Sequence, residues 1–195
     1  MKTKKEWRAH YLQQRQALTI EERVQGSQLI TEHYFRLFDV ERPEVVHLFL
    51  SMADKAEVDT RFILQKLNDE YPQVKTVTSV IAEDQVSLLT TEVRKDTPLI
   101  LNRWGILEPA TRIAFPELAI QEVLTPLLAM DASGYRLGYG KGFYDRFFAA
   151  CSPSVVKTGI NFSPVVAHDI PIDTWDVALN RLVYPGGIFS VNKKA

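Results

Sequence analysis

The stretch from Asp131 to Arg146 constrains the fold more than any other part of this sequence. It holds four glycines and five charged side chains, and it lies between an apolar run, 123–130, and a helix-forming segment, 143–151. A short apolar run bounded by turn residues is typical of a buried strand in a parallel sheet. The order strand, glycine loop, helix directs backbone N–H groups and a helix N-terminus toward an anion. The stretch therefore predicts a phosphate site in an α/β fold.

Glycines let the backbone adopt positive φ and approach a ligand closely, but this loop fits neither common phosphate motif. A Walker A loop has glycine at the position of Tyr135, and Ser or Thr after Lys141, where this chain has Gly142. The spacing of Gly138, Gly140 and Gly142 also differs from G-x-G-x-x-G. On its glycines alone, the stretch is equally compatible with a solvated surface turn.

Hydrophobic periodicity in the rest of the chain predicts helices alternating with strands. Residues 3–38 predict two helices, the second capped by Thr19 with Glu22 completing a capping box. Strands are predicted at 45–50, 74–81, 86–90, 99–101, 120–128, 155–162 and 181–184, and a helix capped by Asp59 or Thr60 is predicted after 51–60. This order favours an α/β protein with a single domain, 1–195. Its mostly parallel, Rossmann-like sheet would form a three-layer sandwich, with the N-terminal helical pair 1–40 packed on it.

Four positions outside the glycine stretch are candidates for ligand contacts. Lys4 and Arg8 share a face of the first predicted helix and can hold phosphates, although a solvated basic stripe is the plainer interpretation. Glu57 lies in a polar loop after a predicted strand, where α/β proteins bind ligands, but it can instead stabilise a helix N-terminus. Trp104, in the predicted loop 103–109, suits either a platform for a flat ligand or the core.

Composition narrows the partners of the chain. Its formal net charge of −1 gives no reason to expect nucleic acid or an acidic membrane as a partner. Cys151 is the only cysteine, so an intrachain disulfide is excluded, and the four histidines lack the spacing of metal ligands. No apolar run approaches the about 18 residues of a membrane span. We therefore expect a cytoplasmic protein. We also expect it to be a monomer.

Taken together, these stretches resemble the 5-formyltetrahydrofolate cyclo-ligase family, also called methenyltetrahydrofolate synthetases. The specific part is Gly134-x-Arg-Leu-Gly-x-Gly-Lys-Gly-x-Tyr-Asp145. Supporting segments are Lys4-x-x-x-Arg8, the Thr-x-Glu-Glu helix start at 19–22, Phe49-Leu-Ser51 followed by Glu57 and Thr60, Trp104 with Glu108-Pro109, and Trp175-Asp176. The likeness extends over nearly the whole chain in the same order.

The resemblance implies an ATP- and Mg²⁺-dependent enzyme that converts 5-formyltetrahydrofolate into 5,10-methenyltetrahydrofolate, with ADP and phosphate as the other products. The formyl oxygen would attack the γ-phosphate of ATP, and N10 of the folate would then attack the activated carbon and expel phosphate. Phosphorylation turns a poor leaving oxygen into a good one. The protein therefore mainly has to position two ligands and neutralise phosphate charge.

Position by position, the resemblance assigns roles to residues of this chain. The ATP-binding residues would be Lys4, Arg8, Arg136, Leu137, Gly138, Tyr139, Gly140, Lys141, Gly142, Phe143 and Tyr144. The substrate-binding residues would be Leu50, Glu57, Trp104, Tyr139, Gly140, Lys141, Gly142 and Phe143. The catalytic residues would be Lys141, Arg136 and Tyr144. Asp145 and Asp176 would bind Mg²⁺, which prefers oxygen ligands.

Three features depart from the family pattern, and two other functions stay open. Phe143 stands where members often have tyrosine, the loop before Glu57 is longer than in some relatives, and Asn180 replaces a common aspartate. One alternative function is a non-catalytic module that binds nucleotide or folate. Retention of the basic residues together with both candidate metal carboxylates counts against it. The other is a sugar-phosphate isomerase-like enzyme, which would not need ATP.

Overall fold

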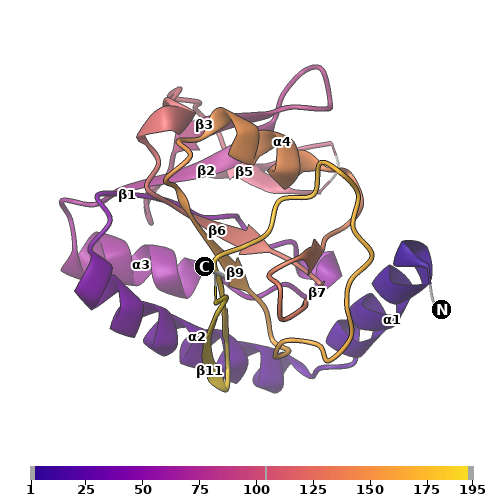
Figure 1. The fold of residues 1–195 in the computed structure, drawn as a ribbon. Coiled ribbons are helices and arrows are strands. Elements are labelled where there is room, and N and C mark those ends of the chain that lie inside the picture. Colours follow the sequence, from indigo (N-terminus) through magenta and orange to yellow (C-terminus); the bar gives the residue numbers. More distant parts are fainter. Residues whose placement is uncertain (1–2, 104, 193–195) are drawn as a thin grey trace.

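The computed structural model describes residues 3–103 and 105–192, and a seven-stranded sheet forms its centre (Figure 1). From edge to edge the strands are β11 (Gly187–Ser190), β10 (Arg181–Tyr184), β9 (Val156–Ile160), β6 (Glu122–Pro126), β1 (Val45–His47), β2 (Lys75–Ile81) and β3 (Leu88–Glu92). Neighbouring strands from β10 to β2 are parallel, and both edge strands pair antiparallel. The predicted α/β fold with a mostly parallel sheet is confirmed.

Helices cover both faces of this sheet and make three layers (Figure 1). On one face, α2 (Ile20–Glu41) and α3 (Arg61–Glu70) join the sheet in a buried cluster that includes Ile30, Phe38 and Leu67. On the other face, α4 (Phe143–Ala150) contributes Phe147 and Phe148 to a second buried cluster. The remaining helix, α1 (Lys4–Gln16), contacts β8 (Arg136–Leu137), a short strand of the glycine stretch. Among the described residues, no helix is long and apolar enough to cross a membrane.

Side chains cap the starts of the first two helices as their sequences dictate. At α2, the Glu22 N–H donates to Thr19 Oγ1 (3.1 Å) and the Thr19 N–H donates to Glu22 Oε2 (2.8 Å), so the predicted capping box is confirmed. Thr3 and Glu6 repeat this arrangement at α1. At α3, Asp59 accepts from the Arg61 N–H (3.1 Å), whereas the Thr60 hydroxyl donates to the Phe49 carbonyl and does not cap the helix.

Several short elements differ from the predictions. The predicted loop 103–109 ends in β5 (Leu107–Pro109), which pairs with β4 (Leu99–Leu101), and within the stretch 129–137 β7 (Ala129–Met130) pairs with β8. The strands β5, β7, β8 and β11 were not predicted. Strands of two to four residues contain too few alternating positions for a clear period, although β4 and β10, which are as short, were predicted. The predicted strand 45–50 ends at His47. Two 3₁₀ turns, η1 (Ala53–Lys55) and η2 (Glu117–Ala119), complete the elements.

The order of the strands reverses at β1, which marks the place where an open α/β sheet binds ligands. From β1 the chain moves to β2 on one side, and it later returns to β6 on the other side of β1. Open α/β sheets bind ligands outside the carboxyl ends of strands at such a reversal. The segments that follow the carboxyl ends of β1, β6 and β9 are 48–60, 127–142 and 161–180. Most of the predicted site residues lie in or next to them.

Candidate active site

The glycine loop, residues 138–142, connects β8 to α4 and has the backbone that its sequence predicted. Gly140 and Gly142 adopt positive φ angles of 87° and 65°, and Gly142 precedes the first residue of α4. A Cβ at Gly140 would lie 2.9 Å from Cζ of Arg8, so the absence of a side chain lets this arginine pack on the loop. Nε of Arg8 donates to the Gly138 carbonyl (3.1 Å). The glycine loop and α1 are thus in direct contact.

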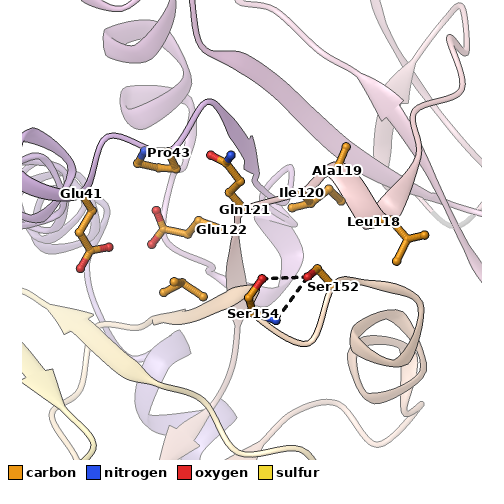
Figure 2. Close-up of a pocket in the computed structure, with 10 residues that line it drawn as sticks. Glu41, Pro43, Leu118, Ala119, Ile120, Gln121, Glu122, Ser152 and Ser154 are labelled. Atoms are coloured by element: carbon orange, nitrogen blue, oxygen red, sulfur yellow. Dashed lines mark hydrogen bonds between the residues drawn. The ribbon is translucent and has the colours of Figure 1, made fainter.

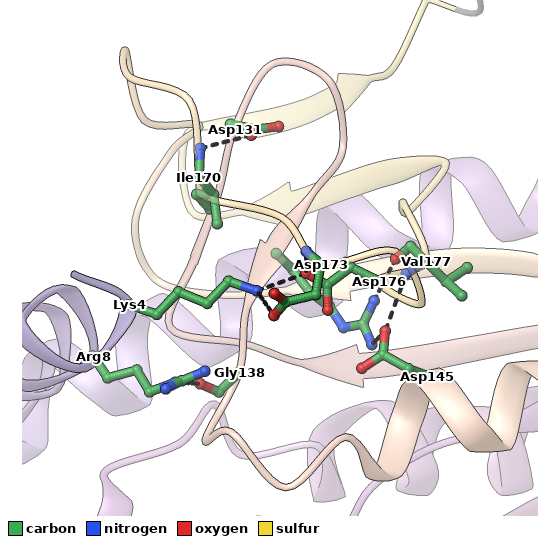
Figure 3. Close-up of polar contacts among 10 residues, drawn as sticks. Lys4, Arg8, Asp131, Gly138, Asp145, Ile170, Asp173, Asp176 and Val177 are labelled. Atoms are coloured by element: carbon green, nitrogen blue, oxygen red, sulfur yellow. Dashed lines mark hydrogen bonds and ion pairs between the residues drawn. The ribbon is translucent and has the colours of Figure 1, made fainter. Parts of the chain in front are cut away.

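Lys4, at the start of α1, forms ion pairs with two aspartates of the segment 161–180 (Figure 3). Its Nζ lies 2.6 Å from Oδ2 of Asp173 and 2.7 Å from Oδ2 of Asp176. Partial burial disfavours the charged form of Lys4, but its bonds to the two aspartates outweigh this and raise its pKa. Partial burial likewise opposes ionisation of Asp176, yet the bonds from Lys4 and from the Asp173 N–H lower its pKa. Both groups therefore stay charged at neutral pH.

A second ion pair joins Arg136 of β8 to Asp145 of α4. Nη2 of Arg136 lies 2.7 Å from Oδ1 of Asp145, and both side chains are largely buried. Nη1 of the same arginine donates to the Val177 carbonyl, and the Val177 N–H donates to Oδ1 of Asp145 at 3.1 Å (Figure 3). Asp145 and Asp176, which are far apart in sequence, therefore meet at the backbone of residues 176–177.

Glu57 is buried beneath the glycine loop rather than exposed at a helix start. Its Oε2 accepts from the Met52 N–H (2.8 Å) and its Oε1 accepts from the Tyr139 hydroxyl (2.7 Å). Burial raises the pKa of Glu57, and these two hydrogen bonds oppose the rise. Burial is also the main reason why the pKa of Tyr139 is raised, so its hydroxyl stays a donor. A carboxylate held in this way can accept from N–H groups of a ligand.

Arg15 completes this part of the site and was not predicted from the sequence. One guanidinium nitrogen donates to the Tyr139 hydroxyl, and the others donate to the carbonyls of Lys55 (2.9 Å) and Leu127 (3.1 Å). The side chain is buried although it is charged. A signal was present, because Trp7, Tyr11 and Arg15 follow at four-residue steps and so share one face of α1. A charged residue in line with two aromatic residues indicates a buried polar partner.

Helix α1 therefore spans the whole site. Lys4 reaches the aspartates, Arg8 reaches the glycine loop, and Arg15 reaches Tyr139 and through it Glu57. At 1.5 Å per residue, Lys4 and Arg15 are separated by about 16 Å along the helix axis. The candidate phosphate and metal residues thus lie toward one end of α1, and Glu57 lies toward the other.

The other predicted site residues differ in their exposure. Lys141 is exposed, and its carbonyl accepts from the Arg146 guanidinium (2.9 Å). Tyr144 is half-buried, and burial raises its pKa. Phe143 lies beneath the same Arg146 guanidinium, 5.5 Å from Cζ to the ring centre, while Leu50 is buried in the core cluster of α2 and α3. Trp104 lies outside the described residues.

A cavity of about 480 Å³ lies elsewhere, where segments lead into β1, β6 and β9 (Figure 2). Glu122 lines it, but this carboxylate already accepts from Arg181 (2.7 Å), Tyr34 (2.9 Å) and Thr158 (2.5 Å). The cavity thus lies at the amino ends of the strands, whereas most of the predicted site residues lie at the carboxyl ends. The buried carboxylate of Glu122 is neutralised by Arg181.

The ion pairs of Lys4 predict a local change when they are removed. In the variant Lys4→Ala, amide hydrogen exchange across residues 4–14 should accelerate, because α1 loses its tie to Asp173 and Asp176. Exchange in α2 should stay unchanged. The matched control is Lys5→Ala, which removes an exposed neighbouring lysine. Equal exchange in both variants would show that Lys4 does not hold the helix.

The chain is similar to known proteins along most of its length. Residues 1–185 match the model of the 5-formyltetrahydrofolate cyclo-ligase family. The 5-formyltetrahydrofolate cyclo-ligase of Haemophilus influenzae is 29% identical over 167 residues, covering 83% of this chain and 87% of that protein. The Escherichia coli enzyme of the same name is 28% identical over 182 residues, covering 91% and 97%.

Solved structures show the same fold. The 5,10-methenyltetrahydrofolate synthetase of Aquifex aeolicus superposes with a TM-score of 0.83 at 24% identity, covering 98% of this chain and 94% of that one. The synthetase of Mycoplasma pneumoniae gives a TM-score of 0.75 at 23% identity, covering 94% and 99%. With a family match over 185 positions and this shared fold, the chain belongs to the 5-formyltetrahydrofolate cyclo-ligase family.

Proposed function

We propose that this enzyme converts 5-formyltetrahydrofolate into 5,10-methenyltetrahydrofolate and that it consumes ATP in the presence of Mg²⁺, releasing ADP and phosphate. One observation carries the ATP part of the proposal. Two cations predicted to bind phosphate, Lys4 and Arg136, pair with the two carboxylates predicted to bind metal, Asp176 and Asp145, next to the glycine loop. With Asp173, the second partner of Lys4, and with Arg8, the cluster holds three carboxylates and three cations, and its ion pairs can exchange partners when Mg-ATP enters.

The exchange follows from simple charge accounting. Lys4 is shared by Asp173 and Asp176, and Arg136 pairs with Asp145. In the bound state these cations would turn to phosphate oxygens, and Asp145 and Asp176 would be free for the metal. Arg8, on the same helix face as Lys4, and the exposed Lys141 would add positive charge beside the glycine loop. Positioned cations of this kind are the main catalytic resource in phosphoryl transfer.

The aspartates suit Mg²⁺ in number and in the oxygens they leave available. Within the described residues, Asp145 forms hydrogen bonds only through Oδ1 and Asp176 only through Oδ2, so each keeps a second oxygen. Mg²⁺ usually takes one or two carboxylates and completes its shell with phosphate oxygens and water. When bound, the ion would neutralise charge on the phosphates and orient them.

The folate would occupy the end of the site near Glu57. A buried carboxylate suits the N–H groups of a pterin ring, and Tyr139 and Arg15 hold this carboxylate in place. Tyr139 precedes Gly140, so the loop that would bind phosphates also borders the folate end. This placement would bring the formyl oxygen toward the γ-phosphate. Once the formyl oxygen is phosphorylated, N10 of the folate would attack the formyl carbon. Loss of phosphate from that carbon and of the proton from N10 would close the ring.

A direct assay tests the proposal. Purified protein, 5-formyltetrahydrofolate and Mg-ATP should generate the near-ultraviolet absorbance of the methenyl product, with one ADP and one phosphate per product. Chelation of Mg²⁺ with EDTA should stop the reaction, and excess Mg²⁺ should restore it. The control omits ATP.

Each competing function predicts a different result in this assay. Binding of ATP or folate without turnover would identify a non-catalytic module. Product formation at the same rate without ATP would contradict the ATP requirement. Absence of product, in a reaction where a known cyclo-ligase is active, would reject the proposed activity.

A further inference from the structure

We infer that Trp175 is the platform on which the base of the nucleotide stacks, an inference that rests on the proposed use of ATP. Trp175 is 71% exposed and lies in a tight turn between Asp173 and Asp176. The Asp176 N–H donates to the Asp173 carbonyl (3.0 Å), and the Asp173 N–H donates to Oδ2 of Asp176 (2.7 Å). The indole therefore projects from a closed turn whose two ends are the partners of Lys4.

Contacts on several sides hold this turn in place. Lys4 ties both aspartates to α1. On the C-terminal side, the Val177 N–H donates to Asp145 (3.1 Å), and the Val177 carbonyl accepts from Arg136. Trp175 is thus an exposed aromatic residue on a braced support, which is the condition under which a stacking platform loses little entropy on binding.

Its exposure distinguishes Trp175 from the other described tryptophan. Trp7 stacks on His168, with ring centres 4.1 Å apart and an interplanar angle of 16°. Trp175 stacks on no ring within residues 3–103 and 105–192. Ile172, three residues earlier, is also exposed, at 53%, and the exposed face of the indole is itself a large apolar surface. A flat ring laid on this surface would remove apolar area from water.

The position of Trp175 selects the base rather than the pterin. The next residue, Asp176, is one of the two predicted metal ligands. Lys4, which forms an ion pair with Asp176, is a predicted phosphate ligand. The base of a nucleotide lies one ribose away from its phosphates, so an aromatic residue beside them is well placed to receive it. Glu57, the predicted folate contact, is linked to Arg15 at the opposite end of α1, about 16 Å along the helix from Lys4.

The test compares a ligand that has a base with one that has none. Binding of Mg-ATP and of Mg-tripolyphosphate is measured by calorimetry for the wild type, Trp175→Ala, Trp175→Phe and the control Leu118→Ala. Leu118 is similarly exposed, at 72%, but it lines the cavity at the amino ends of the strands. Trp175→Ala should weaken Mg-ATP binding by about 5- to 150-fold and leave tripolyphosphate unchanged. Trp175→Phe should retain most of the affinity, and Leu118→Ala all of it.

Steady-state kinetics provide a second measurement of the role of Trp175. In Trp175→Ala, KM for ATP should rise by the same factor as the dissociation constant, with kcat nearly unchanged. Unchanged Mg-ATP binding in this variant would overturn the inference alone. An equal loss for both ligands would assign Trp175 to support of the turn, and would also overturn it. Failure of the wild type to bind Mg-ATP would instead refute the proposed function and this inference with it.

Discussion

Replacing Lys141 by alanine is expected to lower kcat by about 100- to 1,000-fold, the usual cost of removing one charge-stabilising donor, while the fold stays intact. Lys141 lies in the glycine loop, and its side chain is exposed. Its removal therefore leaves no buried group without a partner, and the free energy of unfolding should stay within about 0.5 kcal/mol of wild type. Steady-state kinetics with Mg-ATP and 5-formyltetrahydrofolate, together with urea unfolding, measure both effects.

The matched control for this variant is Lys95→Ala. Lys95 is also an exposed lysine, ion-paired with Asp69 far from the glycine loop. Its loss should leave kcat unchanged and alter stability little, as is usual for exposed ion pairs. If Lys141→Ala keeps full turnover, Lys141 has no role in binding or stabilising the transferred phosphate, and Arg136, Arg8 and Lys4 must supply that charge.

Replacing Arg136 by methionine is expected to lower the free energy of unfolding by about 3–5 kcal/mol and to abolish turnover. The Arg136 and Asp145 side chains are only 7% and 17% exposed, so the change leaves a carboxylate poorly solvated and without its cation. It also removes the donor to the Val177 carbonyl, which braces the segment that carries Asp176. Chemical denaturation measures the first effect, and the product assay measures the second.

Two further variants separate stability from catalysis at Arg136. Arg61→Met removes a comparable ion pair, Arg61–Asp59, whose arginine is 70% exposed, and should cost less than about 1 kcal/mol. The double variant Arg136→Met, Asp145→Leu removes both buried charges and should recover much of the lost stability. It should stay inactive. Recovery of activity with stability would contradict a direct role for Arg136 and Asp145.

The sequence predicted those parts of the fold that depend on local chemistry. The capping box at Thr19 follows from residues within one helical turn, and the structure confirms it. The glycines at 140 and 142 permit the positive φ angles that the loop adopts there. The parallel sheet followed from alternation of long helical and apolar segments, which carry a clear period. Strands β7, β8 and β11 are too short for such a period, and their pairing depends on tertiary contacts.

The sequence singled out candidate site residues but not the partners that these residues have in the structure. Lys4 and Asp176 are 172 positions apart, and nothing local indicates that they form an ion pair without ligand. The role of Asp173 as a second partner of Lys4 was missed for the same reason. The position of Glu57 was predicted, but its burial was not, because burial depends on Tyr139 and Arg15 from two other parts of the chain.

The reach of α1 across the site has a consequence for how the two ligands affect each other. One helix carries both Lys4, toward the proposed nucleotide end, and Arg15, toward the proposed folate end. A shift of this helix that accompanies occupation of one end therefore changes the contacts available at the other. By thermodynamic linkage, the factor by which nucleotide alters folate affinity must equal the factor by which folate alters nucleotide affinity. Under the proposed function, we therefore expect heterotropic cooperativity between the two substrates to depend on this single helix.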